Sequence, residues 1–82
     1  MKLEQFKMDM LLMGWSYTYF NTNLVEPNKK TVTSHVWVKN GSKIVKSYLT
    51  QSIEYHPNNS IVSTTFCSFD SMLHYLMVEE ND

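Results

Sequence analysis

The feature that most constrains the fold is the tetrapeptide Lys39-Asn40-Gly41-Ser42, which lies between two stretches of alternating polar and apolar residues. Asn-Gly is the preferred pair for a two-residue hairpin turn, because both turn positions need a positive φ. A turn at Asn40-Gly41 therefore predicts an antiparallel hairpin. The expected cross-strand pairs are Val38–Lys43, Trp37–Ile44, Val36–Val45, His35–Lys46, Ser34–Ser47, Thr33–Tyr48 and Val32–Leu49.

The alternation continues to residue 55, which predicts one long strand after the turn. The segment Pro57-Asn58-Asn59-Ser60 predicts a second turn, with Asn58-Asn59 as its loop residues. The expected pairs are Tyr55–Val62, Ile53–Thr64 and Gln51–Phe66. The two hairpins then share one apolar face, which carries Val32, Val36, Val38, Val45, Leu49, Ile53, Val62 and Phe66.

Helical periodicity occurs near both ends of the chain. Apolar residues recur at helical spacing over residues 2–13 and over about residues 70–79. Gly14 suits the left-handed position that follows the end of a helix. Ser68 or Asp70 is expected to supply the N-cap of the second helix.

Residues 15–21 are aromatic and rich in Thr, which predicts a first strand, and residues 21–30 are expected to form a connecting loop. The element order is then α-β-β-β-β-α in one domain, residues 1–82. We expect an α+β fold with a four-stranded antiparallel sheet and both helices packed on its valine-rich face. The first strand could lie at either edge of the sheet.

The amino-acid composition indicates the type of genome that encodes the protein and the cell compartment expected for it. The chain has no Ala, no Arg, and only two Gly and two Pro, while residues with AT-rich codons are common. This bias suggests an AT-rich genome. The single cysteine excludes an intramolecular disulfide and favours the reducing cytoplasm. No stretch approaches the ~20 apolar residues of a membrane span, and the net charge of −1 indicates no general attraction to nucleic acid.

The sequence contains no recognisable catalytic motif. A nucleophile could only be Cys67, with His35, His56 or His74 as its base, yet the expected pairing places Cys67 and His35 ~13 Å apart. A working pair needs about 3 Å. Cys67 is therefore expected to be a half-buried apolar residue, and the three histidines are too scattered to bind a metal. We expect a protein without catalytic activity, metal or cofactor.

The sheet face opposite the valines is expected to be exposed. Aromatic residues beside lysines on an open sheet are typical of a binding surface. The expected partner-binding residues are Trp37, Tyr48, Ile44, His35 and Lys46, with Lys39 and Lys43 at the rim. The leading hypothesis is a small protein that docks on and inhibits a larger host protein.

Three alternatives remain at this point. The same aromatic and basic face could bind single-stranded nucleic acid. It could also form a structural homodimer through Trp37 and Ile44. Alternatively, these two side chains could simply be shielded, either by each other or by a loop or the first strand folded over them.

In size and composition the chain resembles the small single-domain proteins encoded by phages of low-GC bacteria. Many of those proteins cover a site on a host protein, and the resemblance implies a partner such as a bacterial defence nuclease. It does not identify the partner, and it assigns no role to the acidic C-terminal residues.

Overall fold

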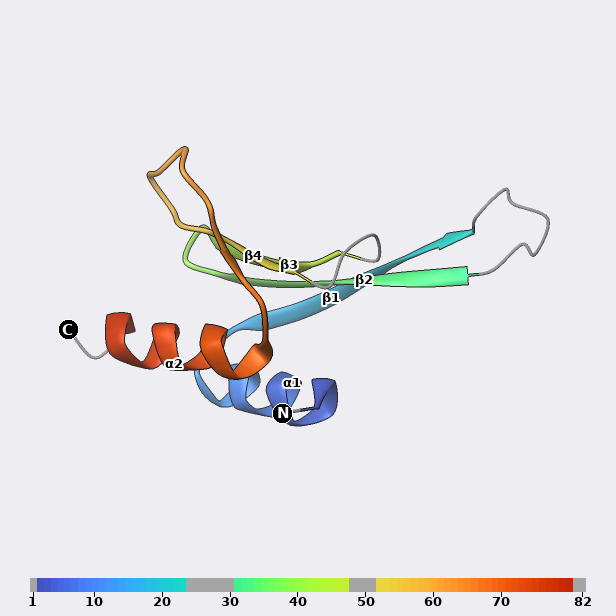
Figure 1. The fold of residues 1–82 in the computed structure, drawn as a ribbon, viewed down its shortest axis with the longest axis horizontal. Coiled ribbons are helices and arrows are strands. Elements are labelled where there is room, and N and C mark those ends of the chain that lie inside the picture. Colours follow the sequence, from blue (N-terminus) through green and yellow to red (C-terminus); the bar gives the residue numbers. More distant parts are fainter. Residues whose placement is uncertain (1, 24–30, 48–51, 81–82) are drawn as a thin grey trace.

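A computed structural model describes residues 2–23, 31–47 and 52–80 of the chain (Figure 1). Its elements are α1 (Leu3–Leu12), β1 (Ser16–Asn23), β2 (Thr31–Lys39), β3 (Ser42–Lys46), β4 (Ile53–His56), β5 (Thr64–Phe66) and α2 (Phe69–Glu80). The strands form one antiparallel sheet in the order β1-β2-β3-β4-β5. The predicted α+β class and antiparallel sheet are confirmed, but the sheet has five strands instead of four.

The Asn-Gly hairpin forms as predicted. Asn40 and Gly41 have φ values of 50° and 86°, the positive values that this turn requires. The pairs from Val38–Lys43 to His35–Lys46 have the expected register. β3 ends at Lys46, and the expected partners Tyr48 and Leu49 lie outside the described residues.

The long strand predicted to reach residue 55 is wrong, because the chain reverses between β3 and β4. Lys46 is the cross-strand partner of Ile53, so β4 runs back along β3. The intervening sequence, residues 47–52, contains no Gly, Pro, Asn or Asp that would have indicated a turn. The reversal places Ile53 on the same face as Ile44, whereas an unbroken strand would have placed it with Val45.

The second hairpin is displaced by two residues from the predicted register. Tyr55 pairs with Thr64, and Ile53 pairs with Phe66. The expected pairs Tyr55–Val62, Ile53–Thr64 and Gln51–Phe66 are therefore wrong. The connection is longer than two residues because β4 ends at His56 and β5 begins at Thr64. A two-residue shift preserves the alternation, and Phe66 therefore still shares a face with Ile53.

Capping hydrogen bonds explain where α1 ends and where α2 begins. Gly14 has a φ of 94°, and its N–H donates to the Leu11 carbonyl at 3.0 Å while the Trp15 N–H donates to Met10 at 3.0 Å. These two bonds form a Schellman motif, as the position of Gly14 predicted. At the start of α2, the Ser71 N–H donates to Ser68 Oγ at 3.2 Å, which identifies Ser68 as the N-cap.

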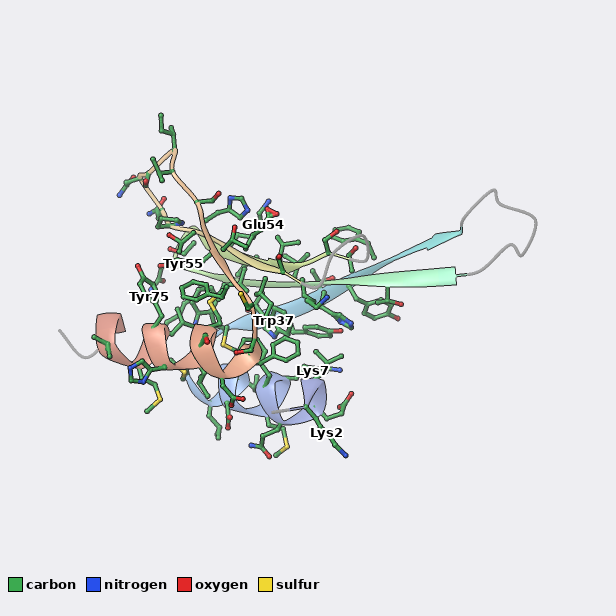
Figure 2. All side chains as sticks on the ribbon, viewed as in Figure 1. Lys2, Lys7, Trp37, Glu54, Tyr55 and Tyr75 are labelled. Carbon is green, nitrogen blue, oxygen red and sulfur yellow. The ribbon has the colours of Figure 1, made fainter. Side chains whose placement is uncertain are left out.

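The core lies against the tryptophan side of the sheet, which corrects the prediction that the valines would face it. Trp37 and Ile44 are 0% exposed and pack with apolar residues of both helices. Figure 2 shows Trp37 between the sheet and the helices. The core residues are Phe6, Met10, Trp15, Trp37, Ile44, Ile53, Met72 and Leu76. Burying these larger side chains removes more apolar area from water than burying valines would, at about 25 cal/mol per Å².

β1 and β2 extend beyond the rest of the sheet. β1 pairs with β2 over the full length of β1, from Ser16–Val38 to Asn23–Thr31, whereas β3 pairs only with residues 35–39 of β2. The outer part of this hairpin therefore projects from the body of the domain as a two-stranded ribbon (Figure 1).

Candidate functional site

The structure separates the residues expected to form one contact surface. Trp37 and Ile44 have no exposed surface, so the expectation that they lie on an open face is wrong. Their burial in the single chain means that neither side chain lies at the surface where the expected homodimer contact would form. Tyr48 lies outside the described residues. Lys39 and Lys43 lie on opposite faces of the sheet. Lys43 shares a face with its cross-strand partner Val38, and the next residue along β2, Lys39, points to the other face.

Two of the predicted residues, His35 and Lys46, remain together. They are a cross-strand pair on the tryptophan side of the sheet, where both are half-buried. The ammonium of Lys39 is used differently, since it donates to the Met13 carbonyl at the C-terminal end of α1 at 2.6 Å. A cation at this position stabilises the helix, whose last carbonyl groups carry partial negative charge.

The surroundings of His35 form the first candidate site, which we call the tyrosine–histidine cluster and define as Lys7, Tyr17, Tyr19, His35 and Lys46. Tyr17 Oη and His35 Nδ1 are 2.6 Å apart and share a hydrogen bond. Lys7 of α1 places its ammonium 4.5 Å from the centre of the Tyr17 ring, in a cation–π contact. The helix therefore supplies a positive charge directly above the aromatic group.

The aromatic rings of the cluster form a row. The centres of Tyr17 and Tyr19 are 6.4 Å apart with 29° between the ring planes. The Tyr17 and His35 centres are 5.8 Å apart with 23° between the planes. Tyr19 is 56% exposed and Tyr17 only half-buried, so Tyr19 presents the accessible ring of the row.

Electrostatics keep the imidazole neutral. Burial lowers the pKa of His35 below its usual value, the positive charges of Lys7 and Lys46 lower it further, and Glu4 opposes them. In the neutral tautomer with its proton on Nε2, Nδ1 accepts the hydrogen bond from the Tyr17 hydroxyl. The charge of the cluster at neutral pH therefore comes from its two lysines.

Sequence reasoning missed both tyrosines. Their signal was the alternation of β1, which places Tyr17 and Tyr19 on one face of the strand. This signal could not be used without the position of β1 in the sheet. The structure pairs Tyr19 with His35 and Tyr17 with Trp37, which brings both rings beside His35, whose partner on the other side is Lys46.

The opposite side of the sheet forms the second candidate site, which we call the valine face. It is defined by residues that alternate with the core-facing side chains: Thr18, Phe20, Val36, Val38 and Val45. Phe20 is 59% exposed and Val38 is 42% exposed. An antiparallel sheet with a core on one side usually carries polar residues on the other, so exposed apolar side chains here are unusual.

Charged groups lie beside the apolar part of the valine face. Lys43 is exposed and is the cross-strand partner of His56. His56 Nε2 lies 3.6 Å from a carboxylate oxygen of Glu54, the partner of Val45. The face therefore combines an apolar centre with both signs of charge at one end.

The other candidate groups remain dispersed. Cys67 is exposed, which corrects the expectation that it is half-buried. Within the described ranges, no three His, Cys, Asp or Glu side chains converge as metal ligands would. None of the helices in this part of the chain has the length and apolar character needed to cross a membrane.

The fold is that of a small α+β domain in which a five-stranded antiparallel meander lies between two helices in the sequence. Comparisons with protein-family models, with curated proteins and with solved structures found no match.

Proposed function

We propose that this protein acts without catalysis, by docking on a larger protein through the valine face and covering part of its surface. The observation that carries the proposal is the exposure of Phe20 and Val38 on the side of the sheet away from the core. The two side chains lie four residues apart along the paired strands, and Val36 between them is 7% exposed. Apolar side chains that stay accessible on one face of a folded domain are typical of an interaction surface.

The composition of the valine face suits a protein partner. Phe20 offers a large aromatic anchor, and a few such residues usually supply most of the binding free energy at an interface. Lys43 and the Glu54–His56 pair would form a polar rim beside it. An apolar centre with a charged rim is the usual arrangement of a protein–protein contact.

The connection between β4 and β5 would widen this surface. Figure 1 shows this segment rising from the sheet on the side away from the helices. Ile61 and Val62 are both exposed in it. We propose that the two helices cover only the tryptophan side of the sheet, which leaves the valine face and this connection available to the partner.

The test uses lysine substitutions at matched exposed positions. Phe20→Lys and Val38→Lys would each place a charge in the proposed interface without disturbing the core. Leu12→Lys is the control, because Leu12 is 84% exposed on α1. Partners would be captured by cross-linking, purified, and titrated against each variant by calorimetry.

The proposal expects the two valine-face variants to bind the purified partner at least about 10-fold more weakly, because they place a charge in a desolvated contact. Leu12→Lys should bind like the unsubstituted protein. If Leu12→Lys alone weakened binding, the contact surface would be on the helices. If no variant weakened it, the valine face would not be the site.

A further inference from the structure

We propose that the tyrosine–histidine cluster binds single-stranded nucleic acid, with a base stacked on Tyr19 and the backbone phosphates close to Lys7 and Lys46. This site lies on the opposite side of the sheet from the valine face, and it does not depend on docking to a protein. Four kinds of observation support it: ring geometry, exposure, charge and the shape of the hairpin.

Ring geometry prepares Tyr19 for stacking. Tyr17 stacks beside the Tyr19 ring, with 29° between the two ring planes. Tyr19 is 56% exposed, so a planar group can approach it from solvent. Tyrosine has only two side-chain torsions to order, and every nucleobase presents a flat π surface to such a ring.

The position of Tyr17 is set independently of any ligand. Its hydroxyl is bonded to His35 Nδ1 at 2.6 Å, and Lys7 lies over its ring at 4.5 Å. Tyr17 is therefore held from both its edge and its face. A rigid second ring limits the loss of conformational freedom when a base stacks on its neighbour.

The charge beside the rings suits a phosphate. Lys7 comes from α1 and Lys46 from β3, and the charges of both reach His35, where they lower the pKa of its imidazole. One carboxylate, that of Glu4, lies 3.7 Å from the Lys7 ammonium and is 83% exposed. The Lys7 side chain is 30% exposed, so solvent reaches the pair mainly from the Glu4 side. An ion pair open to solvent is weak and can be exchanged for a pair with phosphate.

The shape of the hairpin favours an extended ligand. The β1–β2 ribbon continues past the cluster and past the end of β3, as Figure 1 shows. A strand of nucleotides could therefore follow the ribbon outward from Tyr19. Bases in a duplex are already stacked on one another, so an aromatic side chain on a sheet selects unpaired bases.

The experiment measures the fluorescence anisotropy of a fluorescein-labelled oligo-dT of about 15 nucleotides as protein is added, since ring stacking tolerates any base. Tyr19→Ala is compared with Phe20→Ala. These neighbours are 56% and 59% exposed and lie on opposite faces of β1, so they are a closely matched pair. Lys7→Ala is compared in the same way with Lys43→Ala, which removes a cation from the valine face.

We expect Tyr19→Ala to weaken oligo-dT binding about 10-fold, as the loss of one base–aromatic stack does. Lys7→Ala should weaken binding and reduce its dependence on salt between about 50 and 200 mM. Phe20→Ala and Lys43→Ala should leave both quantities unchanged. A duplex of the same length should bind more weakly than the single strand.

The proposal is overturned if oligo-dT does not bind at about 50 mM salt, where phosphate contacts are strongest. It is also overturned if Phe20→Ala weakens binding as much as Tyr19→Ala does, or if the duplex binds equally well. A loss of binding in Phe20→Ala would move the nucleic-acid contact to the valine face. The other two results leave the docking proposal unaffected, because its test uses Phe20→Lys and Val38→Lys against a protein partner.

Discussion

His35 lies at the boundary between the core and the projecting end of the sheet, and the groups around it there set the pKa of its imidazole. Lys7 approaches it from α1 and Lys46 from β3, while Tyr17 donates to its ring and the Glu4 carboxylate raises its pKa. Protonation would place a third positive charge beside the two lysines. The folded protein therefore binds this proton less readily than the unfolded chain does.

The pH dependence of stability follows from that difference. The pKa of His35 is lowered in the folded protein and is about 6.5 in the unfolded chain. Between these two values the unfolded state binds more protons, so its free energy falls relative to the native state. The contribution of His35 to stability is complete above about pH 6.5 and declines as the pH falls toward the folded pKa.

Urea unfolding at about pH 7.5 and pH 5.5 would measure this decline around the unfolded pKa. We expect His35→Gln to show a smaller loss of unfolding free energy between the two pH values than the unsubstituted protein. NMR titration of the imidazole should place its midpoint below that of a free histidine. An equal loss in both proteins would contradict the assignment.

The hairpin between β2 and β3 shows how an element depends on a contact outside it. Gly41 has a positive φ of 86°, and a Cβ added there would lie 2.8 Å from Cγ and Oδ1 of Asn58. Asn58 belongs to the connection after β4, and its N–H donates to Ser42 Oγ at 3.0 Å. The turn is therefore restricted both by its own backbone and by the next hairpin.

Gly41→Ala should lower the free energy of unfolding by about 1–2 kcal/mol through the left-handed backbone alone, with an additional cost from the Asn58 side chain. The double variant Gly41→Ala/Asn58→Ala removes the second cost and should recover part of the stability. Chemical denaturation of both variants measures the two contributions. A double variant no more stable than Gly41→Ala would show that the Asn58 contact has no cost.

The molecule as a whole has apolar side chains on both faces of its sheet, but only one face carries the core. Phe6 meets Trp37 edge-on with ring centres 5.0 Å apart, and Phe69 of α2 lies 4.6 Å from Phe6. One aromatic chain of contacts thus joins the sheet to both helices. The loss of Trp37 would remove the ring contact that links β2 to Phe6 of α1.

Trp37→Ala should therefore disrupt the fold. Large-to-small substitution of a buried Trp costs about 3–5 kcal/mol, which is a large part of the 5–15 kcal/mol typical of a whole domain. Phe20→Ala, on the valine face, should cost less than about 1 kcal/mol. Urea unfolding followed by circular dichroism compares the two, and similar costs would contradict the assignment of the core face.

The predictions that succeeded rest on local interactions. The Asn40-Gly41 turn, the cap at Gly14 and the Ser68 N-cap each depend on the backbone of a few neighbouring residues. The hairpin register and the helix positions follow from them, and they needed no knowledge of distant segments. The pairing of His35 with Lys46 was predictable for the same reason.

The tertiary structure decided which apolar face carries the core, where the chain reverses after Lys46, and where β1 lies. Alternation divides a strand into two faces but does not show which face a helix will cover, because that depends on the total area buried by segments far apart in the chain. The candidate site depended on the same choice. By itself the sequence determined the Asn40-Gly41 turn, the helix caps and the alternation of each strand. Only packing brought Tyr17 and Tyr19 beside His35 and left Phe20 and Val38 exposed, because burial free energy is a property of the assembled layers.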